Sequence, residues 1–277
     1  MRKTRTIIVA GAMSALVVVA GCTKSNVRSS TTTAPTGSAS RADGSNPATS
    51  PVTGSIVVSA AASLTEVFGV LRDGFLRENP EASVTINFGS SGQLAAQILD
   101  GAPVDVAAFA DPQPMTSIED AKLTARPSRI FARNRLVIVT KPGNPRRIRS
   151  LGDLRDVGTV SLCADTAPCG KFADEILRKA DVSVAPTRIT RGPDVKATLR
   201  AVTEGDADAA IVYVTDATAA GRSVASVQIA TGDNVVASYP IATLENSGQL
   251  DTARAFEDYI LGPAGRRILA AAGFQLP

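Results

Sequence analysis

The stretch Ser59-Ala60-Ala61-Ala62-Ser63-Leu64-Thr65-Glu66 stands at the start of the part of the chain that can fold. Before it, an apolar run at 56–58 predicts a buried strand. After it, apolar residues recur at helical spacing, which predicts a helix. The small residues are therefore a strand-to-helix turn, and Ser63 with Glu66 has the spacing of a capping box. Such a turn leaves the first N–H groups of the helix open to an anion, which the helix dipole also attracts.

The same order of strand, small turn and helix recurs further along the chain. A strand at 84–88 precedes a Gly-Ser-Ser-Gly turn, where Ser90 and Gln93 again have capping-box spacing. A strand at 159–163 precedes a third turn at 164–170. Asp194 is well placed as the N-cap of a fourth helix. We expect these four helix ends to face one small oxyanion.

Length and composition narrow the functional classes. A chain of 277 residues corresponds to about two domains, and 44% hydrophobic residues is ordinary for a globular protein. The formal charge of +3 is supplied by Arg2, Lys3 and Arg5, so the rest of the chain is balanced and does not indicate a nucleic-acid surface. The sequence has no histidine, which excludes the commonest general base and every Ser-His-Asp triad.

The N-terminus has the pattern of an export signal. A basic start precedes an apolar stretch at 7–20, which is shorter than the roughly 20 residues that span a bilayer. The run Val19-Ala20-Gly21-Cys22 resembles the bacterial lipoprotein cleavage box. We therefore expect a signal peptide at 1–21 and a lipidated Cys22 that anchors the protein to the outer face of the cytoplasmic membrane. The alternative is an ordinary signal peptide with an incidental cysteine.

Residues 22–54 are rich in Ser, Thr, Ala, Gly and Pro and have few large apolar side chains. Such a segment cannot bury a core, so we expect a disordered tether whose ends lie on the order of 30 Å apart. Residues 55–277 alternate between strand and helix patterns, which predicts an α/β fold.

Cys163 and Cys169 remain as an even pair once Cys22 is acylated. Outside the cytoplasm an even pair is more often a disulfide than two free thiols. Two cysteines without histidine make a poor metal site, and redox pairs usually have C-x-x-C spacing. We expect a structural disulfide that stiffens the third turn.

Taken in order, the four turns resemble the substrate-binding proteins of bacterial molybdate ABC transporters. The likeness covers nearly all of residues 55–277, and the ordered set is far more specific than any single piece. The matching residues are Ala60 to Thr65, Phe88 to Leu94, Gly101-Ala102-Pro103 with Asp105, Ala110-Asp111, Ala167 with Gly170, Asp194-Val195, Ile211-Val212-Tyr213 with Asp216-Ala217, Tyr239-Pro240, and Gly262-Pro263 with Gly273-Phe274.

The resemblance implies the fold of the type II periplasmic binding proteins, in which two α/β lobes enclose a ligand cleft and two crossover strands join them. Lobe I would comprise 55–137 and 241–277, and lobe II 138–240. The chain would cross between the lobes near 134–139 and near 238–242.

The resemblance also implies the binding residues. The family holds a tetrahedral oxyanion with neutral hydrogen-bond donors only. Ser63 and Ser91 would each give a hydroxyl and an N–H group, Cys169 and Val195 a backbone N–H, and Tyr213 its phenol. Cys169 stands where the family has a small Ala. The change affects only the side chain, so the backbone N–H remains as a donor.

The expected function is therefore capture of molybdate, and also tungstate, for delivery to an ABC permease and its ATPase. We expect a monomer that is not an enzyme, with no cofactor, no resident metal and no nucleic-acid partner. The alternatives are a receptor for another tetrahedral oxyanion such as sulfate and, from a different class, an enzyme on the same two-lobed fold. The second alternative lacks an activated nucleophile and a convincing carboxylate pair.

Overall fold

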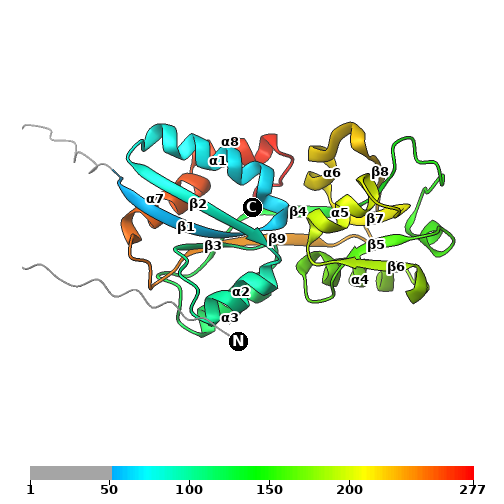
Figure 1. The fold of residues 1–277 in the computed structure, drawn as a ribbon, viewed down its shortest axis with the longest axis horizontal. Coiled ribbons are helices and arrows are strands. Elements are labelled where there is room, and N and C mark those ends of the chain that lie inside the picture. Colours follow the sequence, from blue (N-terminus) through cyan, green and yellow to red (C-terminus); the bar gives the residue numbers. More distant parts are fainter. Residues whose placement is uncertain (1–51) are drawn as a thin grey trace, which may run out of the picture. The chain divides into compact units, whose positions relative to one another are not determined.

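The computed structural model describes residues 52–277, which Figure 1 shows as a coloured ribbon. The expected signal peptide at 1–21, Cys22 and most of the 22–54 tether lie outside the described residues. Residues 52–277 form a mixed α/β structure with two lobes, as the sequence predicts.

The sheet of lobe I is built from the first strands of the chain and one late strand. Its strands are β1 (Gly54–Ala61), β2 (Ala82–Gly89), β3 (Val106–Ala108), β9 (Val236–Thr243) and the first part of β4 (Arg129–Thr140). β1 pairs in parallel with β2 and β3, and β9 pairs antiparallel with β3. The helical segments of this lobe are η1 (Ala62–Leu64), α1 (Thr65–Glu78), α2 (Ser91–Leu99), α3 (Pro112–Asp120), α7 (Leu250–Leu261) and α8 (Pro263–Ala271).

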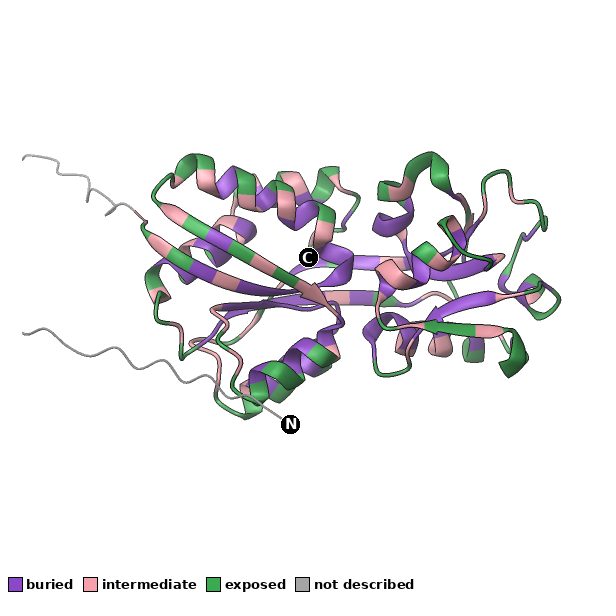
Figure 2. Ribbon diagram, in the orientation of Figure 1, coloured by how far each residue is buried: buried purple, intermediate pink, exposed green. Residues whose placement is uncertain are grey.

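Helices cover both faces of this sheet, so the inner strand β3 is buried on both sides, whereas the edge strand β2 keeps Thr85 and Asn87 exposed (Figures 1 and 2). Successive side chains of a strand point to opposite faces. Val106 and Ala108 therefore pack in one core with α1, α7 and α8, whereas Ala107 packs in a second core with α2 and α3. Burial on both faces is what the continuous apolar runs of the sequence predict.

Lobe II contains a smaller sheet in the order β4-β7-β5-β6, with β8 also paired to β4. Its own strands are β5 (Val160–Cys163), β6 (Ile189–Gly192), β7 (Ala209–Tyr213) and β8 (Ala225–Gln228). Its helical segments are η2 (Leu151–Arg155), α4 (Pro168–Lys179), η3 (Pro186–Arg188), α5 (Val195–Thr203), α6 (Val214–Ala220) and η4 (Gly221–Ser223). The parallel strand β5 lies between β6 and β7.

The long strand β4 runs through both lobes. Its residues 129–135 pair with β9, and its residues 136–140 pair with β7 and β8. The change of partner between Arg135 and Leu136 lies within the crossing expected at 134–139. Residues 236–240, which the expected boundary assigns to lobe II, pair with β4 in the sheet of lobe I. Within 52–277, no helix combines the length and the apolar character needed to cross a membrane.

Candidate ligand-binding site

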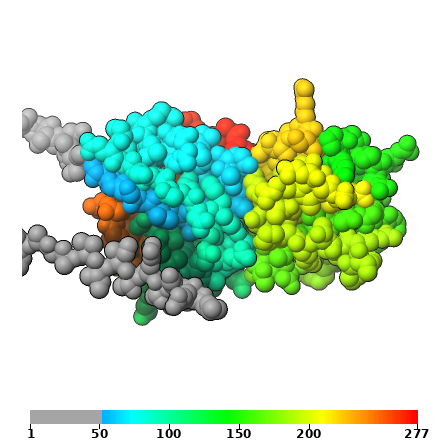
Figure 3. All heavy atoms as spheres, in the orientation of Figure 1, coloured from blue at the N-terminus to red at the C-terminus, as the bar shows by residue number. Residues whose placement is uncertain are grey.

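One pocket lies between the lobes, where the four turns converge. The cavity between its walls is small, with a volume of about 10 Å³. Figure 3 shows where atoms of lobe I, coloured blue to cyan, meet the yellow atoms of lobe II. All five expected binding residues, Ser63, Ser91, Cys169, Val195 and Tyr213, line this pocket. The other lining residues are Ala61, Ala62, Gly89, Ser90, Ala110, Ala167, Pro168 and Asp194, so the described lining contains no Lys or Arg.

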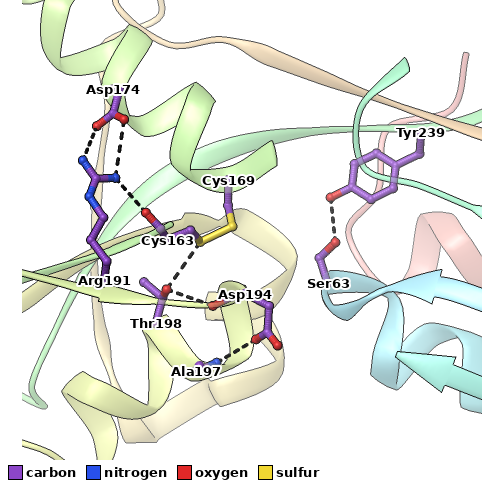
Figure 4. Close-up of a disulfide and its surroundings, with 9 residues drawn as sticks. All are labelled: Ser63, Cys163, Cys169, Asp174, Arg191, Asp194, Ala197, Thr198 and Tyr239. Carbon is purple, nitrogen blue, oxygen red and sulfur yellow. Dashed lines mark hydrogen bonds and ion pairs between the residues drawn. A yellow bond between two sulfur atoms is a disulfide. The ribbon is translucent and has the colours of Figure 1, made fainter. Parts of the chain in front are cut away.

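Ser63 lies in the 3₁₀ turn η1, directly before α1. Its Oγ is buried and lies 3.0 Å from the Oη of Tyr239 (Figure 4). The predicted capping box of Ser63 and Glu66 is wrong, because no side chain caps η1 or α1. The inserted 3₁₀ turn changes the geometry that the spacing assumed, and both side chains bond to other groups. Tyr239, which the sequence analysis did not place at the site, therefore holds the Ser63 hydroxyl.

Ser91 is the first residue of α2 and is almost fully buried. Its Oγ accepts a hydrogen bond from the N–H of Ala110 at 3.0 Å, so its own proton is free to be donated into the pocket. The predicted capping box of Ser90 and Gln93 is also wrong, since Ser90 is the N-cap by backbone geometry but makes no side-chain cap bond. The buried Oγ of Ser90 has no hydrogen-bond partner within 52–277.

A disulfide forms the wall of the pocket at α4. Cys163 ends β5 and Cys169 is the second residue of α4, with their Cα atoms 5.7 Å apart (Figure 4). A Cβ at Gly170 would collide with the backbone carbonyl of Ala164, so glycine permits this tight return of the chain. The N–H of Cys169 belongs to the first turn of the helix, where no intrahelical acceptor exists.

The helix α5 begins as the sequence predicts. Asp194 is its N-cap, and its Oδ1 accepts from the N–H of Ala197 at 2.9 Å (Figure 4). This confirms the predicted cap. The cap satisfies the third N–H of the helix and leaves that of Val195, the first residue, available beside the pocket.

Tyr213 ends β7 with its side chain 1% exposed. Its Oη is buried and has no hydrogen-bond partner among the described residues. Burial raises the pKa of Tyr213 well above its ordinary value, and the nearby Tyr239 and Asp216 raise it further. The ring packs edge-on against Tyr239, with centroids 5.9 Å apart. The phenol is therefore a neutral donor at any physiological pH.

The lobes approach each other closely at the edge of the pocket. A Cβ added to Gly92 in α2 would lie 2.9 Å from the backbone oxygen of Thr166, which precedes α4. Glycine thus allows one backbone to approach another across the two lobes. Polar side-chain contacts also join the lobes, from Lys171 of α4 to Gln113 of α3 and from Lys196 of α5 to Glu66 of α1. At the crossover strand, Asn134 of β4 donates to the hydroxyl of Thr215 in α6 at 2.8 Å.

The chemistry of the pocket is that of an anion site with neutral donors. Four hydroxyl-bearing side chains and the starts of helices from both lobes surround it. Among residues 52–277, no cluster of His, Cys, Asp and Glu could hold a metal ion. Asp194 is the carboxylate of the lining, and it is engaged as a helix cap.

This fold and pocket define a two-lobed solute-binding protein. The family model for bacterial extracellular solute-binding proteins matches residues 56–275. The chain belongs to this family, whose members bind solutes and are not enzymes.

Individual relatives share this architecture. The molybdate-binding protein ModA of Mycobacterium tuberculosis is 39% identical over 224 residues, covering 80% of this chain and 85% of the relative. ModA of Haemophilus influenzae is 27% identical over 234 residues, which are 79% of this chain and 89% of the relative. The solved periplasmic molybdate-binding protein of Azotobacter vinelandii matches with a TM-score of 0.73 and 22% identity, over 80% of this chain and 99% of its own.

Proposed function

We propose that the protein captures molybdate in the pocket between its lobes and delivers it to an ABC permease with its ATPase. The observation that carries this proposal is the convergence of Ser63, Ser91, Cys169, Val195 and Tyr213 on one buried pocket. The 39% identity to a relative named as a molybdate-binding protein supports the same assignment.

The unpartnered buried hydroxyls support an oxygen-rich ligand. A buried polar group without a partner costs about 1–3 kcal/mol, so native proteins rarely keep one without a reason. The Oη of Tyr213 and the Oγ of Ser90 are both in this state within the described chain. A ligand oxygen in the pocket would accept from them and remove that cost.

Neutral donors suit a dianion that carries no proton. Hydrogen bonds to an ionised acceptor are stronger than those between neutral groups, so a dianion strengthens the bonds it receives. The backbone N–H groups of Cys169 and Val195 cannot accept the proton of a hydrogen phosphate ion, which only a hydroxyl of the lining could accept, and this disfavours that ion. Tungstate and sulfate are also tetrahedral dianions, so we propose that tungstate binds as well and that cavity size disfavours sulfate.

The setting of the domain in the cell is part of the proposal. We propose that Cys22 is lipidated, that a tether at 22–54 links it to the domain, and that the protein acts as a monomer at the outer face of the membrane. Lobe I would comprise 55–137 and 241–277, and lobe II 138–240, of which residues 236–240 pair with β4 in the sheet of lobe I.

Radiolabelled palmitate in the wild type, absent from a Cys22→Ser variant, tests the anchor. Equal labelling of the two would contradict it.

Calorimetric titration of residues 55–277 with molybdate, tungstate, sulfate and phosphate tests the ligand. We expect tight binding of molybdate and tungstate and much weaker binding of sulfate and phosphate. Equal weak binding of all four anions would contradict the assignment, and preferred binding of sulfate would make the protein a sulfate receptor.

A further inference from the structure

Three charged residues form an ion cluster that joins the lobes beside the pocket. The Nζ of Lys196 lies 2.8 and 2.6 Å from the two carboxylate oxygens of Glu66 and 2.8 Å from Oδ1 of Asp216. Lys196 is in α5 and Asp216 in α6, both in lobe II, whereas Glu66 is in α1 of lobe I. One ion pair therefore lies within a lobe and the other crosses between lobes.

Each member of the cluster is close in sequence to a residue that lines the pocket. Glu66 follows Ser63 by one helical turn, Lys196 follows Val195 directly, and Asp216 follows Tyr213 by three residues. Any motion that separates the start of α1 from the start of α5 opens the pocket and also breaks the pair between Glu66 and Lys196. The pair between Lys196 and Asp216 survives such a motion, because both residues move together.

Burial distinguishes the two ion pairs. The side chain of Asp216 is fully buried and that of Lys196 is 16% exposed, whereas Glu66 is 54% exposed. A buried carboxylate without a partner is strongly destabilising, so Lys196 is required inside lobe II whether or not the lobes are closed. Burial alone would lower the pKa of Lys196, but Asp216 and Glu66 raise it on balance, and the amine stays charged. Glu66 is not needed to balance a buried charge.

We propose that Glu66 is a positioning residue of the binding site: through Lys196 it holds the lobes closed and so slows the release of the ligand without touching it. This proposal rests on the proposed molybdate function. The cluster has one positive and two negative charges, so an electrostatic effect of Glu66 on a bound dianion would be repulsive. Closure and repulsion therefore predict opposite changes in affinity when Glu66 is neutralised.

The contact between Lys171 and Gln113, which also joins the lobes, provides a matched control. Lys171 meets the neutral amide of Gln113 at an exposed position, so its loss should matter little. We expect Glu66→Gln to weaken molybdate binding about fivefold, the effect of a partly exposed ion pair, and Gln113→Ala to weaken it by less than about twofold.

The test begins with molybdate titration of the wild-type domain, followed by the dissociation rate, the affinity at rising NaCl and the ligand-induced rise in Tm for both variants. We expect Glu66→Gln to dissociate faster, to lose much of the salt dependence of affinity, and to gain less Tm from ligand than the wild type. X-ray scattering of the ligand-saturated variant should show a larger open fraction.

The outcomes separate the two proposals. A wild-type domain that does not bind molybdate would contradict the proposed function and the role of Glu66 with it. If the wild type binds, unchanged or tighter binding by Glu66→Gln would overturn the role of Glu66 alone. An equal fall in Tm with and without ligand, at unchanged affinity, would also overturn it, because it would indicate a purely structural role.

Discussion

The two walls of the pocket are built differently. Lobe I presents the hydroxyls of Ser63, Ser90 and Ser91, and two of these are held by bonds to Tyr239 and to the N–H of Ala110. Lobe II presents the starts of α4 and α5, where Cys169 and Val195 offer backbone N–H groups, together with a single phenol from Tyr213.

The bonds that hold the donor groups in place also differ between the two walls. The turn before α4 is closed by a disulfide and the start of α5 by the Asp194 cap, both of which act on the backbone. In lobe I the supporting bonds act on the hydroxyls themselves, from the phenol of Tyr239 to Ser63 and from the N–H of Ala110 to Ser91. Substitutions in lobe I should therefore change the donors directly, whereas in lobe II most substitutions should change only how rigidly the donors are held. Tyr213 is the exception, and the following tests start from it.

The largest effect should come from Tyr213→Phe. We expect molybdate affinity to fall by about 2–3 kcal/mol, because a desolvated ligand oxygen loses its donor. The free energy of unfolding without ligand should not fall, since the Oη has no partner within 52–277. Calorimetric titration and urea unfolding measure the two quantities. Unchanged affinity would show that the phenol does not reach the ligand.

Removal of the disulfide should lower stability more than affinity. Cys163 and Cys169 are six positions apart, and closure of so short a loop contributes about 2 kcal/mol in the chain-entropy model. A Cys163→Ser/Cys169→Ser variant should lose this amount of unfolding free energy in urea, yet keep most of its affinity because the N–H of residue 169 remains. Reduced wild type is the control. A loss of affinity as large as that of Tyr213→Phe would contradict the distinction between the walls.

Ser63→Ala should lower molybdate affinity by about 1 kcal/mol and also reduce stability without ligand, because the buried Tyr239 hydroxyl loses its partner. Ser90→Ala is the matched control: it removes a buried hydroxyl that has no partner within the described residues, so stability without ligand should not fall. Equal destabilisation by the two changes would show that the contact with Tyr239 contributes nothing.

The smallest effect concerns pH and the buried charge behind Tyr213. Burial raises the pKa of Asp216 to about 6, despite the attraction of Lys196. A carboxyl whose pKa is raised on folding favours the folded state below its unfolded pKa and loses this contribution as pH rises through its folded pKa. From about pH 5 to about pH 7, Asp216 should therefore remove roughly 1 kcal/mol of stability.

Urea unfolding of the wild type and of Asp216→Asn across this pH range measures the contribution. The stability difference between the two proteins should shift by that amount in favour of the variant as pH rises. A stability difference that stays constant with pH would mean that Asp216 does not titrate in this range. Lobe II would then not differ from lobe I in the pH dependence that a buried carboxyl confers.

The sequence predicted those parts of the fold that depend on local patterns. Apolar runs located the main strands, and Asp194 was predicted as a cap because a cap bond joins residues only three apart. The helix α6 was not predicted, since it follows β7 without a small turn and begins with the β-branched Val214 and Thr215. Its position is fixed by packing rather than by local preference.

The capping boxes failed for a related reason. Ser63 bonds to a residue 176 positions away and Glu66 to one 130 positions away, and no local spacing can reveal such partners. The five site residues could be predicted to share one pocket only through the resemblance to a known family. Tyr239 and the ion cluster were missed because their roles arise only when distant elements meet.

The close approach of Gly92 to Thr166 has a consequence for ligand choice. The two backbones lie so close that a Cβ at residue 92 would meet the oxygen of Thr166, and a rearrangement of side chains would not give the lobes room to approach further. We therefore expect this close approach to limit how far the lobes can close, and with it the size of the anion that the closed pocket accepts. A larger anion would keep the lobes from closing fully and leave the pocket open to water. A smaller anion would lie too far from some of the donors, because the lobes could not close further around it.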